Sequence, residues 1–379
     1  MHYFDHSATT PLHLQVKNLM DEVNDNYFGN PSSIHALGRK ARVIIEKSRS
    51  QMAKAIGCKP EEIIFTSGGT EANNLILWNL IGQNRKHVVT SVIEHPAILK
   101  TLENLSEFGV SYTAVGVDKN GLINPHDVEK AIRDETGLIS IMLANNEVGT
   151  IQPIADISII AKTHGVMMHS DGVQALGKIP IEVKNLGVDC MSFSAHKFNG
   201  PKGTGSLFVK KGIKLKPLLT GGNQERSMRA GTENTAGIVG MGLAAEIATE
   251  NLESSTQHYH SLVNNFKEQL KSIIPDAVYH GHPDYHLPGL ISVSFPGYRN
   301  DLLMPLLDNM GMVVSSGSAC SSGDVKPSKI LSAMKVNDEL IHSTLRISFG
   351  MNNSKEEIST LTQAIKSSLE NIRSHSKHD

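Results

Sequence analysis

The order of apolar runs along the chain constrains the fold more than any other sequence feature. Short apolar runs bounded by glycine, asparagine or aspartate alternate with longer segments whose apolar residues recur at helical spacing. The runs that predict strands are 61–67, 87–92, 110–117, 138–143, 166–171, 189–194 and 205–210. Because these runs contain few alternating polar positions and are followed by helical segments, they predict an α/β fold with a mostly parallel sheet covered on both faces.

The pattern changes near residue 232. A long helical stretch over about 232–272 precedes a mixture of strands and helices in the last third of the chain. That last third predicts strands at 290–296 and 345–349, helices over 301–310 and from about 327, 338 and Ser354, and hence a smaller α+β domain. The length of 379 residues exceeds what one hydrophobic core usually supports, so we expect at least two structural units.

Charge and cysteine content narrow the class of function. The 36 Lys and Arg residues nearly balance the 38 Asp and Glu residues, which argues against direct binding of nucleic acid and favours small-molecule chemistry. The three cysteines are too few and too far apart for a disulfide framework or a CxxC metal clip. The N-terminus resembles neither a signal nor a transit peptide, and no apolar stretch is long enough to span a membrane, so we expect a soluble cytoplasmic protein.

A glycine-rich turn lies between a predicted strand and a predicted helix at 66–74, with the sequence TSGGTEANN. Glycines let the backbone approach a ligand, and the free amides at a helix start suit an anion such as phosphate. The alternative is a simple turn with a helix cap, because Thr70 and Glu71 are favourable there. The segment is not a Walker loop, since it lacks Gly-Lys-Ser/Thr.

Two further residues follow predicted strands. Lys197, in SFSAHKFNGPKG (192–203), has hydroxyl and imidazole neighbours, and a lysine buried in a pocket can form a Schiff base with a carbonyl cofactor. Asp171 lies at the carboxyl end of the run 166–171, where open α/β sheets bind ligands, and a protonated pyridine nitrogen would be a suitable partner for it. The alternatives are an exposed lysine and an aspartate that caps a helix.

A phosphate cradle, an acid at a strand end and a Schiff-base lysine are the contacts that pyridoxal 5'-phosphate (PLP) requires. Their order resembles that in fold-type I PLP enzymes, and specifically in cysteine desulfurases of the NifS/IscS-like class. The motifs that carry this resemblance are DHSATTP (5–11), FGNPSSIH (28–35), TSGGTEANN (66–74), EHPA (94–97), NNEVGTIQP (145–153), SDGVQALG (170–177), SFSAHKFNGPKG (192–203), GGNQERSMRAGTENT (221–235), SSGSACSSG (315–323) and LRISFG (345–350).

The resemblance implies a fold and a domain division. The fold would be a large domain with a mostly parallel seven-stranded sheet flanked by helices, and a smaller α+β domain. Residues 16–257 would form the PLP-binding domain, residues 258–379 would form the small domain that carries the cysteine loop, and residues 1–15 would pack with the small domain.

The resemblance also implies roles for cofactor-binding residues. Lys197 would hold the cofactor as a Schiff base and move the substrate α-proton. Asp171 would pair with the pyridine nitrogen, Gln174 would hydrogen-bond the phenolic oxygen, and His95 would stack on the ring and assist proton transfer. The phosphate would be bound by the Gly69 amide and by the side chains of Thr70, Ser194 and His196.

Substrate and subunit contacts follow from the same resemblance. Asn146 and Arg346 would hold the substrate carboxylate, because a guanidinium fork matches its two oxygens. Thr232 would reach the phosphate bound to the other subunit, which implies a homodimer. The substrate would be L-cysteine.

The resemblance also implies that Cys320 would decide the reaction. It lies in a segment rich in glycine and serine, which suits a mobile loop better than a packed core. Its thiolate would take the substrate sulfur as a persulfide, leaving alanine, and pass it to an acceptor protein for iron–sulfur cluster assembly or thio-modification. Cys190 reads as a strand-core thiol and Cys58 as a residue in the turn before Pro60.

Three alternatives remain open from the sequence. The chain could be a selenocysteine lyase or another PLP lyase or aminotransferase of the same fold, or a catalytically silent module that docks sulfur acceptors. A zinc site at His280, His282 and His286 is disfavoured, because this HxHxxxH set lies among glycine and prolines in a predicted solvated loop without fixed geometry. No metal is therefore expected.

Overall fold

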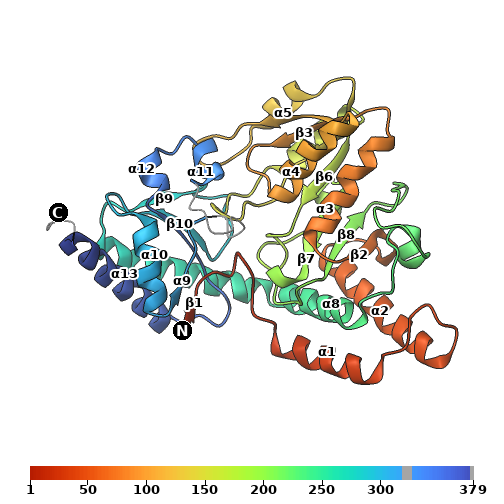
Figure 1. Ribbon diagram of the computed structural model, residues 1–379, viewed down its shortest axis with the longest axis horizontal. Helices are drawn as coiled ribbons and strands as arrows, with labels where there is room; N and C mark the ends of the chain where they lie inside the picture. Colours follow the sequence, from red (N-terminus) through yellow and green to blue (C-terminus); the bar gives the residue numbers. More distant parts are fainter. Residues whose placement is uncertain (318–326, 376–379) are drawn as a thin grey trace.

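The computed structural model describes residues 1–317 and 327–375. Figure 1 shows a larger α/β part on the right and a smaller part, built mainly from the C-terminal third of the chain, on the left. The helices are α1 (Leu14–Asn26), α2 (Ala36–Ala55), α3 (Gly69–Trp78), α4 (Pro96–Leu105), α5 (Pro125–Ala131), α6 (Ile154–Thr163), α7 (Val183–Leu186), α8 (Thr235–Glu250), α9 (Leu252–Ile273), α10 (Asn300–Asn309), α11 (Lys329–Ala333), α12 (Asp338–Ile341) and α13 (Lys355–His375). The strands are β1 (His2–Tyr3), β2 (Ile63–Thr66), β3 (His87–Ser91), β4 (Ser111–Val115), β5 (Thr136–Ser140), β6 (Met167–Asp171), β7 (Cys190–Ser194), β8 (Gly205–Val209), β9 (Val278–His280), β10 (Leu290–Ser294), β11 (Met312–Val313) and β12 (Thr344–Ser348).

The larger part is built on one sheet. Within the described residues this sheet has seven strands in the order β2-β8-β7-β6-β5-β3-β4, and only β8 runs antiparallel to its neighbours. Every residue of β2, β3, β7 and β8 is buried. The predicted mostly parallel sheet is therefore confirmed, and the carboxyl ends of its parallel strands meet at one edge.

Both faces of this sheet are covered, because side chains alternate between them along each strand. On β2, Ile63 and Phe65 belong to a core cluster that includes side chains of α2 and α8. Ile64, between them, belongs to a second cluster with side chains of α3 and α4. The two-sided cover explains why the strands read as continuous apolar runs.

The smaller part has its own sheet and core. Strand β10 pairs antiparallel with both β12 and β9, and α9, α10 and α13 contribute side chains to the cluster beneath. Phe4 belongs to this cluster, and β1 pairs in parallel with β11. The first residues of the chain therefore pack against elements that lie more than 250 positions further on.

The helical stretch predicted over 232–272 is in fact divided. Helix α8 ends at Glu250 and α9 begins at Leu252, with Asn251 between them. Asparagine competes for local backbone hydrogen bonds and favours helix ends, which the apolar spacing alone does not reveal. Strands β1, β9 and β11 were not predicted because two or three residues are too few to show a period.

The histidines of the HxHxxxH set have fixed hydrogen bonds. The prediction of a loop without fixed geometry is wrong for His280, which lies in β9 with Nε2 2.6 Å from Ser294 Oγ. Burial lowers the pKa of His280 to about 4. His286 Nδ1 lies 2.7 Å from the Leu287 carbonyl oxygen. Among the described residues no group of three or more His, Cys, Asp or Glu side chains could hold a metal ion.

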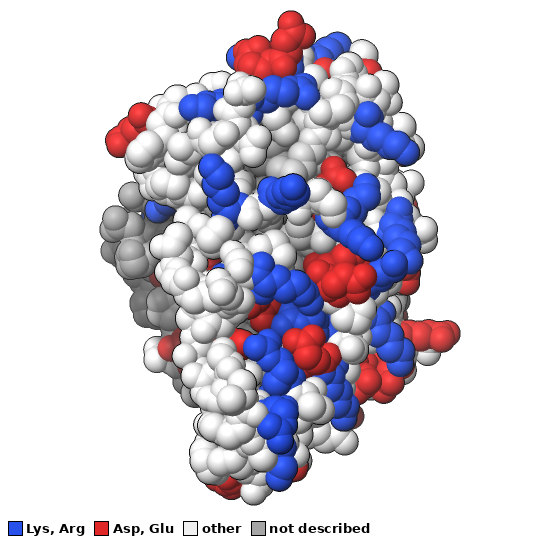
Figure 2. Space-filling view, turned by 90° about the vertical axis from the view of Figure 1, so that its right-hand side faces the viewer, with Lys and Arg blue, Asp and Glu red and all other residues white. Residues whose placement is uncertain are grey.

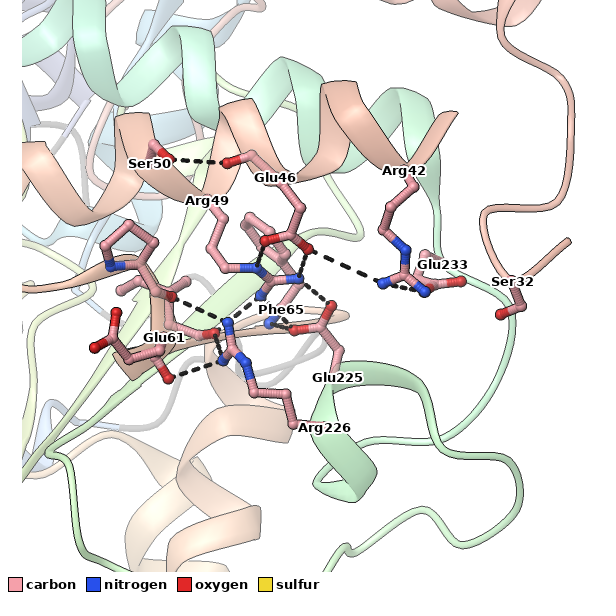
Figure 3. Close-up of polar contacts among 12 residues, drawn as sticks. Ser32, Arg42, Glu46, Arg49, Ser50, Glu61, Phe65, Glu225, Arg226 and Glu233 are labelled. Atoms are coloured by element: carbon pink, nitrogen blue, oxygen red, sulfur yellow. Dashed lines mark hydrogen bonds and ion pairs between the residues drawn. The ribbon is translucent and has the colours of Figure 1, made fainter. Parts of the chain in front are cut away.

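A buried ion pair ties α2 to the loop that precedes α8. Arg49 donates to both carboxylate oxygens of Glu225, at 2.7 and 2.8 Å, and both side chains are 2% exposed (Figure 3). The Glu225 carboxylate also accepts from the backbone N–H of Phe65 in β2, at 2.9 Å. The pair thereby fixes the loop against the edge of the large sheet.

The same loop is strained. Glu225, Arg226 and Ser227 have φ angles of 44°, 57° and 64°, in the left-handed region that side chains rarely adopt. Such conformations persist only where surrounding contacts hold them. Here the holding contacts include an ion pair between Arg229 Nε and Glu71 Oε1, at 3.1 Å, which joins the loop to the first turn of α3.

Replacing Arg49 with methionine is expected to destabilise the protein by about 3–5 kcal/mol, because it leaves the Glu225 carboxylate buried without a cation. The shift in the urea unfolding midpoint measures this loss. As the matched control, Arg299→Met removes the exposed partner of Asp301, and because solvent screens this surface ion pair, the variant should unfold at nearly the wild-type midpoint. Equal midpoint shifts for the two variants would show that the buried pair does not hold the loop.

The exterior carries both signs of charge. On the face drawn in Figure 2, Lys and Arg side chains are interspersed with Asp and Glu side chains. Neighbouring opposite charges limit the field that any one of them produces, in keeping with a formal net charge of -2. In the described parts of the chain, no helix combines the length and apolar character that crossing a membrane requires.

Candidate active site

A cavity of about 260 Å³ lies at the carboxyl ends of the parallel strands, and we call it the active-site cavity. Such edges of open α/β sheets are where ligands bind. The structure brings together there most of the residues singled out from the sequence: Gly69, Thr70, His95, Asn146, Asp171, Gln174, Ser194, His196, Lys197 and Arg346. Thr232 is exposed and does not line this cavity. Cys320 lies outside the described residues.

One end of the cavity forms an anion cradle, made by residues 67–70, Ser194 and His196. Helix α3 begins at Gly69, and no side chain caps its N-terminus. A Cβ atom at Gly69 would lie 2.6 Å from Val173 Cγ2, so only glycine fits there. The uncapped amides and the positive end of the helix dipole suit a phosphate.

Asp171 is the last residue of β6 and is 6% exposed. Its carboxylate accepts from Asn73 Nδ2 at 2.7 Å and from the backbone N–H of Val173 at 3.0 Å. Among the described residues no Lys, Arg or His side chain forms an ion pair with it. A buried carboxylate without a cation fits a ligand that brings its own positive charge, such as a protonated pyridine nitrogen.

Lys197 ends the short 3₁₀ helix η4 (Ala195–Lys197), directly after β7. Its Nζ donates to the carbonyl oxygens of Ser7 and Ala8, at 2.6 and 2.7 Å. These carbonyls come from the N-terminal segment, almost 190 residues away in sequence. The amine is therefore held at the cavity wall by backbone oxygens.

The two histidines of the cavity differ in environment. His95 caps α4, and its Nδ1 accepts from the backbone N–H of Ala97 at 3.1 Å, which leaves the proton of the neutral ring on Nε2. His196 Nδ1 lies 3.1 Å from Thr9 Oγ1. Burial, followed by the nearby charge of Lys197, lowers the pKa of His196 to about 4, so its ring is neutral at pH 7.

Arg346 lies in β12 and is 2% exposed. One terminal nitrogen donates to Asp5 at 2.7 Å, and the other donates to the carbonyl oxygen of Asn146 at 3.2 Å. Its Nε is buried and has no hydrogen-bond partner among the described residues. A buried donor without a partner is costly, so this guanidinium is suited to an anionic ligand.

Sequence reasoning missed several residues that shape the cavity. Asn73 fixes the Asp171 carboxylate, the carbonyls of Ser7 and Ala8 hold Lys197, and Asp5 pairs with Arg346. The motifs DHSATTP and TSGGTEANN contain all of them, but motif membership alone does not say which partner each residue meets. Spacing could not reveal contacts between positions so far apart in the chain.

The thiols of the other two cysteines, Cys190 and Cys58, are unreactive near pH 7. Cys190 is fully buried at the start of β7, as predicted for a strand-core thiol, and burial raises its pKa. Burial, aided by Glu62, raises the pKa of Cys58 to about 12. Neither thiol ionises near pH 7, so neither is a nucleophile there.

The cavity residues fit PLP. The anion cradle matches its phosphate, the uncompensated Asp171 carboxylate matches its ring nitrogen, and Lys197 matches its aldehyde carbon. An α/β sheet that carries these three contacts at its carboxyl edge defines a PLP enzyme of fold type I.

Comparison with known proteins narrows this class. The chain belongs to the family described as Aminotransferase class-V, which matches residues 2–361. "Cysteine desulfurase IscS" of Dictyoglomus turgidum is 43% identical over 379 residues, covering 99% of this chain and 96% of that protein. "Cysteine desulfurase IscS" of Methanosarcina thermophila is 43% identical over 377 residues, covering 99% and 93%.

Solved structures agree in fold. A structure entitled "NIFS-LIKE PROTEIN" superposes with a TM-score of 0.91 at 38% identity, covering 97% of this chain and 99% of that one. A second, "SspA in complex with cysteine", has a TM-score of 0.81 at 33% identity, covering 92% and 99%. The resemblance to cysteine desulfurases and the fold-type I prediction are confirmed, and the cofactor of this family is PLP.

Proposed function

We propose that this chain is a cysteine desulfurase in which Cys320 receives the sulfur of L-cysteine as a persulfide and passes it to an acceptor protein. The relatives named cysteine desulfurase cover nearly the whole chain and support the activity. The reaction is balanced without an added oxidant or reductant. Substrate cysteine loses its sulfur at the Cβ–S bond and gains a proton to become alanine, while the Cys320 thiol becomes a persulfide.

Substrate binding uses the guanidinium of Arg346 and the neighbouring Asn146. Asp5 and the Asn146 carbonyl orient the guanidinium, and its remaining donors bind the substrate carboxylate. This anchoring fixes the substrate Cα relative to Lys197 and His95, which line the same cavity.

The cofactor is held by the anion cradle, Asp171, Gln174 and Lys197. When bound, PLP acts as an electron sink for negative charge that develops on the substrate carbons. Lys197 Nζ moves the proton at the substrate Cα, and His95, whose Nδ1 is occupied by the Ala97 amide, assists through Nε2.

The sulfur-transfer step is supported by the contacts of the two residues that flank the segment with Cys320, Ser315 and Ser328. Ser315 exchanges backbone hydrogen bonds with Arg346, at 3.1 and 2.6 Å. On the far side of the segment, Ser328 donates to the buried Glu147 carboxylate, next to Asn146, at 2.5 Å. Both anchors therefore adjoin the residues that bind the substrate carboxylate. Cys320 is five positions after Ser315 in the sequence, and this supports its assignment to sulfur transfer.

The dimer and the acceptor belong to the same proposal. Thr232 is exposed and lies away from the cavity of its own chain, which supports a role at the phosphate of a second subunit. A thiol that carries persulfide must return to the reduced state between turnovers, so we place the enzyme in the cytoplasm. The acceptor serves iron–sulfur cluster assembly or thio-modification.

Incubating the PLP-loaded protein with L-cysteine and a thiol reductant is expected to yield alanine and sulfide in equal amounts. Amino-acid analysis and sulfide determination measure the two products. 3-Mercaptopyruvate, formed only when a 2-oxo acid is added as the amino acceptor, would instead indicate an aminotransferase. Alanine from L-selenocysteine but not from L-cysteine would indicate a selenocysteine lyase. The absence of any product and of a bound-cofactor absorption band would indicate a silent module.

A further inference from the structure

Lys178 is a buried amine beside the active-site cavity to which the mechanism above gives no role. It lies four residues after Gln174, in the turns that follow β6, and its Nζ donates to Gln174 Oε1 at 2.8 Å. The side chain as a whole is partly exposed, but its amine lies inside the protein. Burial, followed by the charges of Lys197 and Arg346, lowers its pKa to about 7.

The contact determines which way the Gln174 amide faces. In its charged form Lys178 has three donors and no acceptor, so the amide turns its oxygen toward Lys178 and its nitrogen away. On the other side, Gln174 Nε2 donates to the Ser7 carbonyl oxygen at 2.9 Å. One hydrogen of the amide nitrogen is then used, and the second is left for an acceptor in the cavity that Gln174 lines.

The hydrogen bonds of Gln174 also connect Lys178 to Lys197. The Ser7 carbonyl oxygen that accepts from Gln174 also accepts from Lys197 Nζ, at 2.6 Å. Lys178, Gln174, Ser7 and Lys197 thus form one chain of hydrogen bonds along the cavity wall. A rotated Gln174 amide would turn its oxygen toward the Ser7 carbonyl and disturb both ends of this chain.

We propose that Lys178 is a positioning residue that locks the Gln174 amide with its nitrogen available to the phenolic oxygen of PLP. This inference rests on the proposed function only in that the cavity holds PLP. Lys178 does not touch the reacting atoms and acts through Gln174. The charged and titratable groups that face its amine are Lys197, Arg346, His6 and His196.

A spectroscopic titration of the PLP-loaded protein tests the proposal. Lys178→Met keeps much of the stem and removes the donor. A hydrogen bond to the phenolate favours the deprotonated form of the cofactor linkage, so loss of the oriented Gln174 amide raises the pKa read from the absorption band by about one unit or more. We expect kcat to fall about tenfold, with KM nearly unchanged. Lys178→Arg retains a donor and restores most of the titration, and Lys184→Met, at an exposed lysine, titrates like the wild type.

A double-mutant cycle separates positioning from a general effect of charge. Gln174→Met removes the amide, so adding Lys178→Met should shift the titration little further if Lys178 acts through Gln174. Additive shifts, or a Lys178→Met variant that binds PLP and titrates like the wild type, would overturn the proposal. Circular dichroism confirms that each variant is folded. The spectroscopic titrations need no substrate, so a wild type that forms no alanine would refute the proposed function and leave this inference standing.

Discussion

The Lys197→Ala variant is expected to lose about 10⁴-fold or more in the rate of alanine formation from L-cysteine, the largest loss of any single substitution. The side chain has two roles in our account, since it attaches the cofactor and moves the substrate α-proton. Its Nζ is already held at the cavity wall by the Ser7 and Ala8 carbonyls. No described neighbour offers a second primary amine in the same position.

Two measurements check this expectation. The initial rate of alanine formation gives the loss of activity, and the protein mass after borohydride reduction shows whether the cofactor is attached through Lys197. The exposed Lys214→Ala variant serves as the matched control and should behave like the wild type. A Lys197→Ala variant that still becomes covalently labelled would mean that another lysine holds the cofactor, for which the buried amine of Lys178 would be the first candidate.

The features that could be predicted from the sequence are those determined by residues close together in the chain. The sheet followed from short apolar runs, and Asp171 was expected at a strand end because an acid terminates the run 166–171. The anion cradle followed from glycines between a strand and a helix, and Gly69 indeed has room for no side chain. These features depend on residues close together in the chain, where periodicity and turn chemistry are informative.

Contacts between distant segments could not be predicted in this way. Asp5 and Arg346 are 341 positions apart, yet their side chains meet at 2.7 Å because β12 lies beside the first residues of the chain. The burial of Arg49 and Glu225 likewise depends on how α2 packs against the loop before α8. Each of these residues, taken alone in the sequence, resembles an ordinary exposed charge.

The His280 segment shows the opposite error. Glycine and proline nearby suggested a loop, but β9 forms because β10 offers a strand with which to pair. A short strand of this kind owes its stability to its partner rather than to its own sequence. The Ser294 hydroxyl then fixes the His280 ring.

The central claim is that Cys320 carries the sulfur. The Cys320→Ser variant, loaded with PLP, should form alanine from L-cysteine at less than about 1% of the wild-type rate, because a hydroxyl is a far weaker nucleophile toward sulfur than a thiolate. Its cofactor absorption band and the pH dependence of that band should not change. Cys58→Ser, which replaces a thiol whose pKa is raised to about 12, should retain full activity.

The most direct measurement combines the rate of alanine formation with the mass of the peptide that contains residue 320, taken after one turnover without reductant. The account predicts that this wild-type peptide gains one sulfur atom, and that Cys320→Ser gains none and forms almost no alanine. Alanine formation by Cys320→Ser at the wild-type rate would contradict the account.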